Sequence, residues 1–134
     1  MRYELTKDLE TGNVLIDTEH RQLLKAVNDL MDACAQGQGR SRLEPTIDFL
    51  TSYVNKHFND EESLQTRSVY PGYAGHKQFH ENYKRQLNQV AQEMKSQGAS
   101  IAVLSKLNQV VGILVNHIRV DDKKVAQHVK QSGI

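Results

Sequence analysis

The chain has 134 residues, which is enough for one domain with its own hydrophobic core and too short for two. Its 17 basic and 16 acidic residues are scattered and give a net charge of +1, which excludes the basic stripe of a nucleic-acid-binding or membrane-surface protein. The single cysteine cannot form an internal disulfide, residues 1–10 lack the pattern of a secretion signal, and no apolar run approaches the roughly 18 residues of a membrane span. We therefore expect one cytoplasmic domain over residues 1–134, without membrane or nucleic-acid partners.

Helical periodicity starts after an irregular arm. Residues 1–16 lack it, and Thr11-Gly12-Asn13 is typical of a turn, so we expect an arm that leads to an N-cap at Asp17. Apolar residues then recur at three- and four-residue steps between glycines, and Pro45 suits the first turn of a second helix. The pattern predicts four long helices and a short C-terminal helix, over residues 18–36, 45–69, 73–97, 101–118 and about 122–131. Short connections leave each helix beside its predecessor, which predicts an all-α, antiparallel up-down four-helix bundle.

Five of the six histidines interrupt the apolar stripes of the four long helices, at His20, His57, His76, His80 and His117. Residues four apart on a helix differ by only about 40° in direction. Glu61 therefore projects with His57, and His80 projects with His76. A lone histidine on an apolar stripe is more often a hydrogen-bonded core residue, but five on converging helices would lack partners without a metal. Imidazoles and carboxylates without thiolate suit iron, manganese or zinc, and their number predicts two ions.

The order and spacing of these residues resemble the hemerythrin family, most closely its bacterial branch. The pattern is a histidine, then H-x-x-x-E, then H-x-x-x-H, then H-x-x-x-x-D. The matching segments span nearly the whole chain and are Gly12-Asn13, Ile16–His20, His57–Glu62, Tyr70-Pro71, His76–His80 and His117–Asp122. Bacterial relatives often have a tryptophan fifteen residues before the first histidine, where this chain has Leu5, with Tyr3 nearby. That departure concerns the packing of the arm and not the ligand set.

The resemblance implies two non-haem iron ions joined by an oxo or hydroxo bridge. Carried over residue by residue, it assigns His76, His80 and His117 to one iron, His20 and His57 to the other, and Glu61 and Asp122 to both as bridging carboxylates. The choice of Asp122 over Asp121 comes from the resemblance alone. Because a residue five positions after His117 on a regular helix would point about 140° away from it, we expect the helix to distort there.

The resemblance also implies reversible binding of dioxygen. One iron has three histidines and is fully coordinated, whereas the other has two and keeps an open position, where nitric oxide or a small anion would also fit. Reversible binding needs a dry pocket, for which the resemblance points to Leu23, Phe58, Ile113, Leu114 and Ile118; ordinary core packing explains each of these residues equally well. We therefore expect an oxygen carrier, for storage or delivery, and not an enzyme.

Two other functions stay open. Di-iron oxidases and peroxidases use carboxylate-rich sites with Glu-x-x-His motifs, and the histidine-rich set of this chain favours a carrier. Hemerythrin-like domains also occur fused to signalling proteins as sensors, but Met1 and the lack of a linker suggest a free-standing chain. Outside the motifs, we expect His128 at the surface of the terminal helix and Cys34 as a small buried residue of the first helix.

Overall fold

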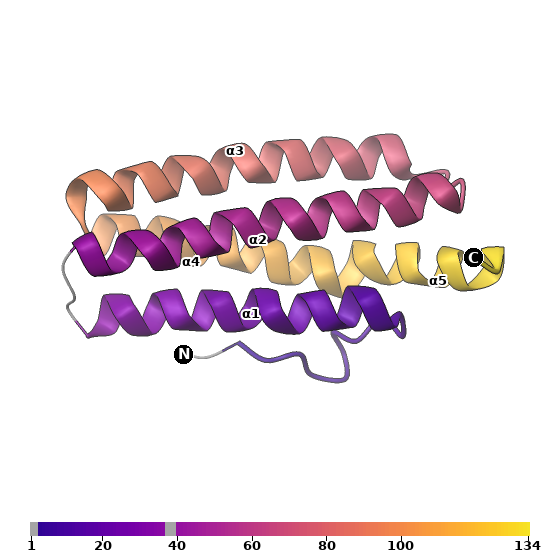
Figure 1. Cartoon of the computed structure of the whole chain (residues 1–134), viewed down its shortest axis with the longest axis horizontal. Coiled ribbons are helices and arrows are strands. Elements are labelled where there is room, and N and C mark those ends of the chain that lie inside the picture. Colours follow the sequence, from indigo (N-terminus) through magenta and orange to yellow (C-terminus); the bar gives the residue numbers. More distant parts are fainter. Residues whose placement is uncertain (1–2, 37–39) are drawn as a thin grey trace.

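A computed structural model describes residues 3–36 and 40–134, with only the backbone of residues 40–42. The described residues form five α-helices and one π-helical segment and contain no strand: α1 (Val14–Ala35), α2 (Arg40–Arg67), α3 (Tyr73–Gln97), α4 (Ile101–His117), η1 (Ile118–Asp122) and α5 (Lys123–Ser132). The four long helices lie side by side (Figure 1), and each packs against the next in chain order. The prediction of an all-α four-helix bundle is confirmed.

The start of α1 differs from the prediction. Asn13 is the N-cap, because its side-chain oxygen accepts a hydrogen bond from the backbone N–H of Ile16 at 3.0 Å. Asp17, predicted as the N-cap, lies inside the helix. Its carboxylate accepts hydrogen bonds from the backbone N–H and hydroxyl of Thr11 at 2.8 and 2.7 Å, and from the N–H of Gly12 at 3.1 Å. Asp17 therefore holds the turn of the arm against α1.

The start of α2 was also predicted too late. The helix begins at Arg40, so Pro45 lies inside it and not in its first turn. The fixed φ of proline fits a helix, and its missing N–H removes one backbone hydrogen bond near the start of α2. The connection between α3 and α4 follows the sequence signals: Gly98 ends α3 at a φ of 77°, and the side chain of Ser100 caps α4 by accepting the N–H of Val103 at 3.2 Å.

The N-terminal arm packs along α1. The backbone of Tyr3 forms two hydrogen bonds with the side-chain amide of Asn28, at 2.8 and 2.7 Å, and Leu9 is buried in the main core. Asp8 accepts a hydrogen bond from the Arg119 guanidinium of η1 at 3.2 Å. Leu5, at the position of the tryptophan found in bacterial relatives, is half-buried against the same core. The arm therefore covers the outside of the bundle beside α1.

The apolar core consists of two clusters, and polar residues separate them. The main cluster runs along the bundle, and the smaller one lies beneath α5. On α1, His20 stands between Ile16 of the small cluster and Leu23 of the main one, and on α2 Glu61 stands between Leu64 and Phe58 in the same way. Buried histidines and carboxylates thus form a polar layer across the interior.

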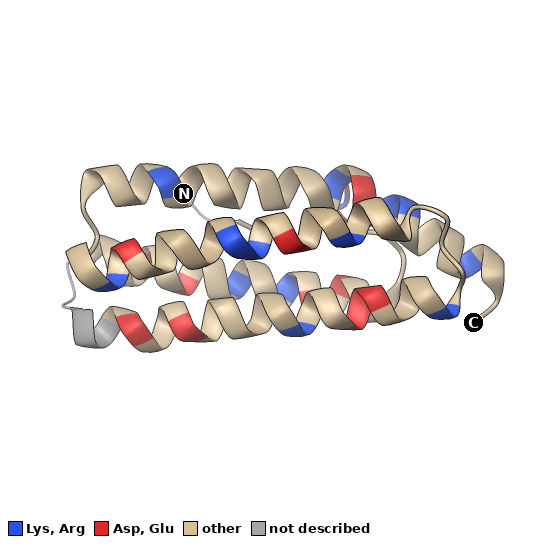
Figure 2. Cartoon of the chain, turned by 90° about the horizontal axis from the view of Figure 1, so that it is seen from above, with Lys and Arg blue, Asp and Glu red and all other residues tan. Residues whose placement is uncertain are grey.

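The C-terminal third of the chain is one continuous helical run, Ile101–Ser132, in which α5 extends α4 beyond η1 (Figure 1). Contrary to the expectation from sequence, the run is apolar enough by length and composition to cross a membrane, with a mean hydropathy of 1.4 in its best 18-residue window. Of that window, 39% is buried against the rest of the bundle, as in a core helix of a protein without a membrane span. Lysines, arginines and acidic residues are interspersed along the helices (Figure 2).

Two residues outside the motifs differ from their predicted environments. His128 is half-buried and not at the surface: its Nε2–H donates to the carbonyl of Ser68 at 2.8 Å, and its ring lies 5.3 Å from that of Tyr70. This contact ties α5 to the connection between α2 and α3. Cys34 is half-buried, and burial raises the pKa of its thiol.

Candidate metal centre

All seven residues predicted as ligands are buried in the polar layer. The most accessible of them, His76, is 7% exposed. Their positions follow from the helical spacing, because α1, α2, α3 and α4 each turn at least one imidazole inward. The set comprises His20 of α1, His57 and Glu61 of α2, His76 and His80 of α3, His117 of α4 and Asp122 of η1.

The π-helical segment brings Asp122 onto the same face as His117. Its wider turn carries residues five apart closer together than a regular α-helix does, and Oδ1 of Asp122 lies 3.1 Å from Nε2 of His117. The neighbouring Asp121 meets the other side of the ring, with its carboxylate 2.9 Å from Nδ1. The prediction that the helix is distorted after His117 is confirmed.

The ligand atoms form two groups, and within each group they all lie within 4.8 Å of one another. One group comprises Glu61, His76, His80 and His117, and the other comprises His20, His57, Glu61 and Asp122. Glu61 belongs to both groups, so the two potential metal positions are adjacent. This division agrees with the three-and-two partition of histidines that the sequence resemblance implies.

Glu61 presents one carboxylate oxygen to each group. Its Oε1 lies 2.5 Å from Nε2 of His76 and 3.3 Å from Nε2 of His80. Its Oε2 lies 3.6 Å from Nε2 of His57. A carboxylate in this position can bind one ion through each oxygen.

Asp122 repeats this arrangement. Its Oδ1 lies 3.2 Å from Nε2 of His76 and 3.1 Å from Nε2 of His117, whereas its Oδ2 lies 3.0 Å from Nε2 of His20. All five imidazoles therefore approach the two carboxylates through Nε2. The two halves of the cluster share both carboxylates, as a binuclear metal site requires.

Three of the histidines have a carboxylate partner on the opposite ring nitrogen. Nδ1 of His57 lies 2.9 Å from Glu19, Nδ1 of His80 lies 2.8 Å from Glu62, and Asp121 plays this role for His117. Such partners set the tautomer in which Nδ1 carries the proton and Nε2 is free for a metal. Sequence reasoning missed these three acids, although each is adjacent in sequence to a predicted ligand.

Burial keeps two of the imidazoles neutral. It lowers the pKa of His80 to about 2, with a further contribution from the neighbouring His76, and it also lowers the pKa of His57. A histidine must be unprotonated at the coordinating nitrogen to bind a metal ion. These two rings therefore meet that condition near neutral pH.

The two bridging carboxyl groups have pKa values that move in opposite directions. Burial and the nearby Asp122 raise the pKa of Glu61 well above its usual range. Burial also opposes ionisation of Asp122, but contacts with His117, His20 and His76 hold its pKa well below the usual range. Two carboxylates in a buried space cannot both ionise without positive charge, which a divalent cation would supply.

Several buried side-chain atoms in the described ranges have no hydrogen-bond partner, and they show whether the residues of the polar layer fit a metal. In the part of the chain that the structure describes, no hydrogen bond reaches either nitrogen of His20, Nε2 of His80, Oε2 of Glu61 or Oδ1 of Asp122. Buried polar atoms in native proteins nearly always have a partner. Of these atoms, Nε2 of His20, Nε2 of His80, Oε2 of Glu61 and Oδ1 of Asp122 face the two groups and are potential metal ligands, so the residues fit two ions.

Four of the five residues predicted for the oxygen pocket line the main core next to the cluster. Leu23, Phe58, Leu114 and Ile118 are fully buried, and the phenyl ring of Phe58 stacks on the imidazole of His80. Ile113 differs, because its side chain is 40% exposed and borders a surface hollow with Phe79 and His117. The structure does not bring Ile113 together with the other four.

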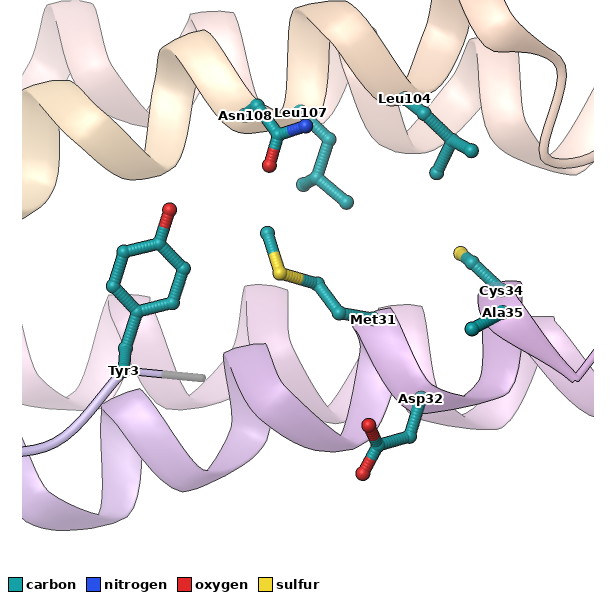
Figure 3. Close-up of a pocket in the computed structure, with 8 residues that line it drawn as sticks. All are labelled: Tyr3, Met31, Asp32, Cys34, Ala35, Leu104, Leu107 and Asn108. Carbon is teal, nitrogen blue, oxygen red and sulfur yellow. The ribbon is translucent and has the colours of Figure 1, made fainter. Parts of the chain in front are cut away.

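A separate cavity of about 410 Å³ lies between the arm, α1 and α4 (Figure 3). Tyr3, Met31 and Cys34 face Leu104 and Leu107 across it. Cys34 follows His20 by 14 residues, or about 21 Å along a helix. The cavity is therefore remote from the polar layer, and its walls are mainly apolar.

The fold and the site define a four-helix bundle with a buried, histidine-rich binuclear metal site. Residues 11–129 match the hemerythrin HHE cation binding domain. The chain is 33% identical over 124 residues to bacteriohemerythrin of Stenotrophomonas maltophilia, covering 92% of this chain and 78% of that relative. It is 30% identical over 129 residues to bacteriohemerythrin of Pseudomonas aeruginosa, covering 93% and 80%. Myohemerythrin of Theromyzon tessulatum is 26% identical over 122 residues, covering 91% and 89%. The chain belongs to the hemerythrin family.

Proposed function

We propose that this chain holds two non-haem iron ions with a bridging oxo or hydroxo group and binds dioxygen reversibly as a cytoplasmic carrier. The observation that carries the proposal is that Glu61 and Asp122 each present one oxygen to each group of imidazoles. The names of the relatives, bacteriohemerythrin and myohemerythrin, support it. Two ferrous ions in this site would supply the electrons that bind dioxygen and take them back on its release.

The unequal number of histidines leaves one ligand position open. His76, His80 and His117 would complete one iron together with the bridges, whereas His20 and His57 would leave the other one ligand short. Dioxygen, nitric oxide or a small anion would bind at that position. Five imidazoles, which are neutral ligands when they bind iron, favour the ferrous state, and a carboxylate-rich set would instead favour the oxidising chemistry of a di-iron enzyme.

The apolar wall next to the cluster supports reversible binding over oxidation. Leu23, Phe58, Leu114 and Ile118 are each at most 2% exposed, and none of them offers a polar atom. A dry wall keeps water and protons away from the bound ligand, which slows irreversible oxidation of the irons. This part of the chain therefore acts by exclusion of water.

A sensor is the second candidate function. Asp122 lies at the junction of α4 and α5, and Arg119 in the same π-helical segment contacts Asp8 of the arm. A shift of Asp122 on ligand binding would reach both the arm and the terminal helix. A difference in hydrogen exchange of the arm and α5 between the deoxy and oxygenated forms would favour sensing, and equal exchange would favour a carrier.

The proposal is tested by anaerobic optical titration of the iron-loaded, reduced protein with dioxygen, followed by flushing with argon. Absorption bands in the near-ultraviolet and around 500 nm that appear with dioxygen and vanish under argon establish a reversible carrier. Direct conversion to a stable diferric spectrum contradicts the proposal and favours an oxidase or redox sensor. Iron content measured on the same sample must be two per chain.

A further inference from the structure

Glu19 is held at both oxygens. Its Oε1 accepts the Nδ1–H of His57 at 2.9 Å, and its Oε2 accepts the ammonium of Lys56 at 2.8 Å. The carboxylate is almost completely buried, whereas the lysine is largely exposed. Lys56 also contacts Asp60 at 2.8 Å. A surface cation thus reaches inward to a buried acid that holds a metal-binding imidazole.

Glu62 forms a second chain of contacts of the same kind, and we call each lysine–glutamate–histidine chain a relay. Its Oε2 accepts the Nδ1–H of His80 at 2.8 Å, and its Oε1 accepts the ammonium of Lys77 at 3.1 Å. Each relay joins neighbouring helices, because Lys56 of α2 reaches Glu19 of α1, and Lys77 of α3 reaches Glu62 of α2. The histidines at their inner ends belong to different groups of the cluster.

The third outer acid provides an internal comparison. Asp121 accepts the Nδ1–H of His117 at 2.9 Å, but its side chain is 47% exposed, and its second oxygen can therefore be hydrated. The side chains of Glu19 and Glu62 are only 4% and 10% exposed. A buried carboxylate oxygen without a partner is costly, so these two acids need a cation where Asp121 needs none. Lysine contacts occur at the two acids that water reaches least.

We propose that Lys56 and Lys77 are positioning residues, each of which fixes one buried carboxylate and through it one histidine of one metal. The inference rests on the proposed metal centre. Lys56 acts through Glu19 on His57, at the iron with the open position, and Lys77 acts through Glu62 on His80, at the other iron. Loss of either lysine leaves a buried carboxylate oxygen without its partner, which lowers the stability of the bundle as well as the hold on the histidine, so both effects are measured.

The test follows anaerobic release of iron from the full chain, loaded with two ferrous ions, to a ferrous chelator. Glu19→Gln and Glu62→Gln identify the release phase of each metal. Lys56→Met should accelerate the first phase and Lys77→Met the second by about fivefold each, less than the roughly 10–100-fold cost of losing an outer-shell partner itself. Lys56→Arg and Lys77→Arg, which keep the charge, should restore the rates.

A double-mutant cycle separates positioning from a general structural effect. Lys56→Met should add nothing in the Glu19→Gln background, and Lys77→Met nothing in the Glu62→Gln background. Lys25→Met, which removes a surface pair with Asp29 at 3.0 Å on α1, is the matched control and should leave both phases unchanged. Unfolding temperatures of the metal-free variants measure any general loss of stability separately from the release rates.

Three outcomes overturn the inference: release rates equal to those of the control, acceleration of the same phase by both lysine variants, or an effect that persists when the glutamate is replaced. These readouts do not involve dioxygen. If the wild-type chain binds two irons but fails to release dioxygen under argon, the proposed function is lost and the relays can still be measured. If the relays fail while oxygen binding is reversible, only this inference is lost.

Discussion

The imidazole of His117 lies face to face with the phenyl ring of Phe79, with ring centroids 3.8 Å apart and 8° between the planes. His80 and Phe58 stack in the same way, at 3.8 Å and 5°. Tyr83 contacts both phenyl rings, at 5.8 and 6.0 Å. Two imidazoles of one group are therefore held in orientation by an aromatic layer that also covers one side of the centre.

Replacing Phe58 should shorten the lifetime of the oxygenated protein. Phe58→Leu keeps an apolar side chain at a cost of about 1–2 kcal/mol in stability, but it uncovers one face of His80 and admits water. We expect a several-fold faster conversion to the diferric form, measured as decay of the oxygenated spectrum. Phe49→Leu is the control, because Phe49 is exposed and stacks on Tyr53, away from the predicted ligands. Equal decay rates in the two variants would argue against the role of Phe58 in excluding water.

Replacing His76 should remove iron. Its Nε2 approaches both bridging carboxylates, at 2.5 Å from Glu61 and 3.2 Å from Asp122, so His76→Ala is expected to lose at least one of two irons per chain. Iron is measured by elemental analysis after gel filtration. His128→Ala serves as control, since it breaks the contacts with Ser68 and Tyr70, outside the ligand set, and should retain both irons. Two irons in His76→Ala would refute the ligand assignment.

Val69 should be replaceable by glycine with a gain in stability. Its φ of 57° is left-handed, a conformation that a β-branched residue rarely adopts, and its side chain is 80% exposed. The hydrogen bonds from Val69 to Thr66 and from Tyr70 to Gln65 form a Schellman ending of α2, where glycine is preferred. Val69→Gly should raise the free energy of unfolding by about 0.5–1 kcal/mol, measured by urea titration.

The control for this prediction is Val14→Gly. Val14 is equally exposed but lies in the first turn of α1, where glycine offers no relief of strain and costs backbone entropy. This variant should be unchanged or less stable than the wild type. A loss of stability in Val69→Gly as well would mean that the left-handed conformation carries no strain.

Gln65 should be replaceable by methionine. Its side chain is fully buried, and neither atom of its amide has a hydrogen-bond partner among the described residues. Gln65→Met keeps the length and removes the unpaired amide, so the free energy of unfolding should rise by about 1–2 kcal/mol in thermal or urea denaturation. Gln92→Met, at an exposed position of α3, should change little. A destabilised Gln65→Met would instead reveal an ordered water bound to the amide.

The stability of the metal-free protein should depend on the protonation of His76. Burial lowers the pKa of His76, but the close contacts with Asp122 and Glu61 and their negative charges outweigh it and raise the pKa from 6.5 to about 9. The resulting stabilisation is complete below pH 6.5 and is lost as the pH rises through 9, at most about 3 kcal/mol in all. Urea titrations of the metal-free protein between pH 6 and 10 measure it.

Two controls test whether this pH dependence comes from the protonation of His76. His76→Gln cannot gain the proton, so its free energy of unfolding should fall less than that of the wild type across the same range. The fall that remains comes from Glu61, whose raised pKa also lowers stability as the pH rises. The iron-loaded wild type should lack this dependence, because the metal replaces the proton between His76 and the carboxylates. A metal-free wild type that is equally stable at pH 6.5 and 9.5 would contradict the assignment.

The sequence by itself determined the number of α-helices and which of their side chains enter the core, but not where α1 and α2 begin. Periodicity placed His20, His57 and His117 on inward faces, because the 3.6-residue repeat relates a side chain to its own helix without reference to any other. Family resemblance, and not periodicity, selected Asp122, and the structure supplied the reason in the π-helical segment that ends at this residue.

The tertiary structure alone decided contacts between segments that are distant in sequence. Asn13 and Asp17 are both competent helix caps, and the choice between them came from the arm, whose turn occupies the carboxylate of Asp17. Likewise, Glu19 pairs with His57 and Lys56, which lie 38 and 37 positions further along the chain. Periodicity shows which way a side chain points, but its partner depends on how the helices pack.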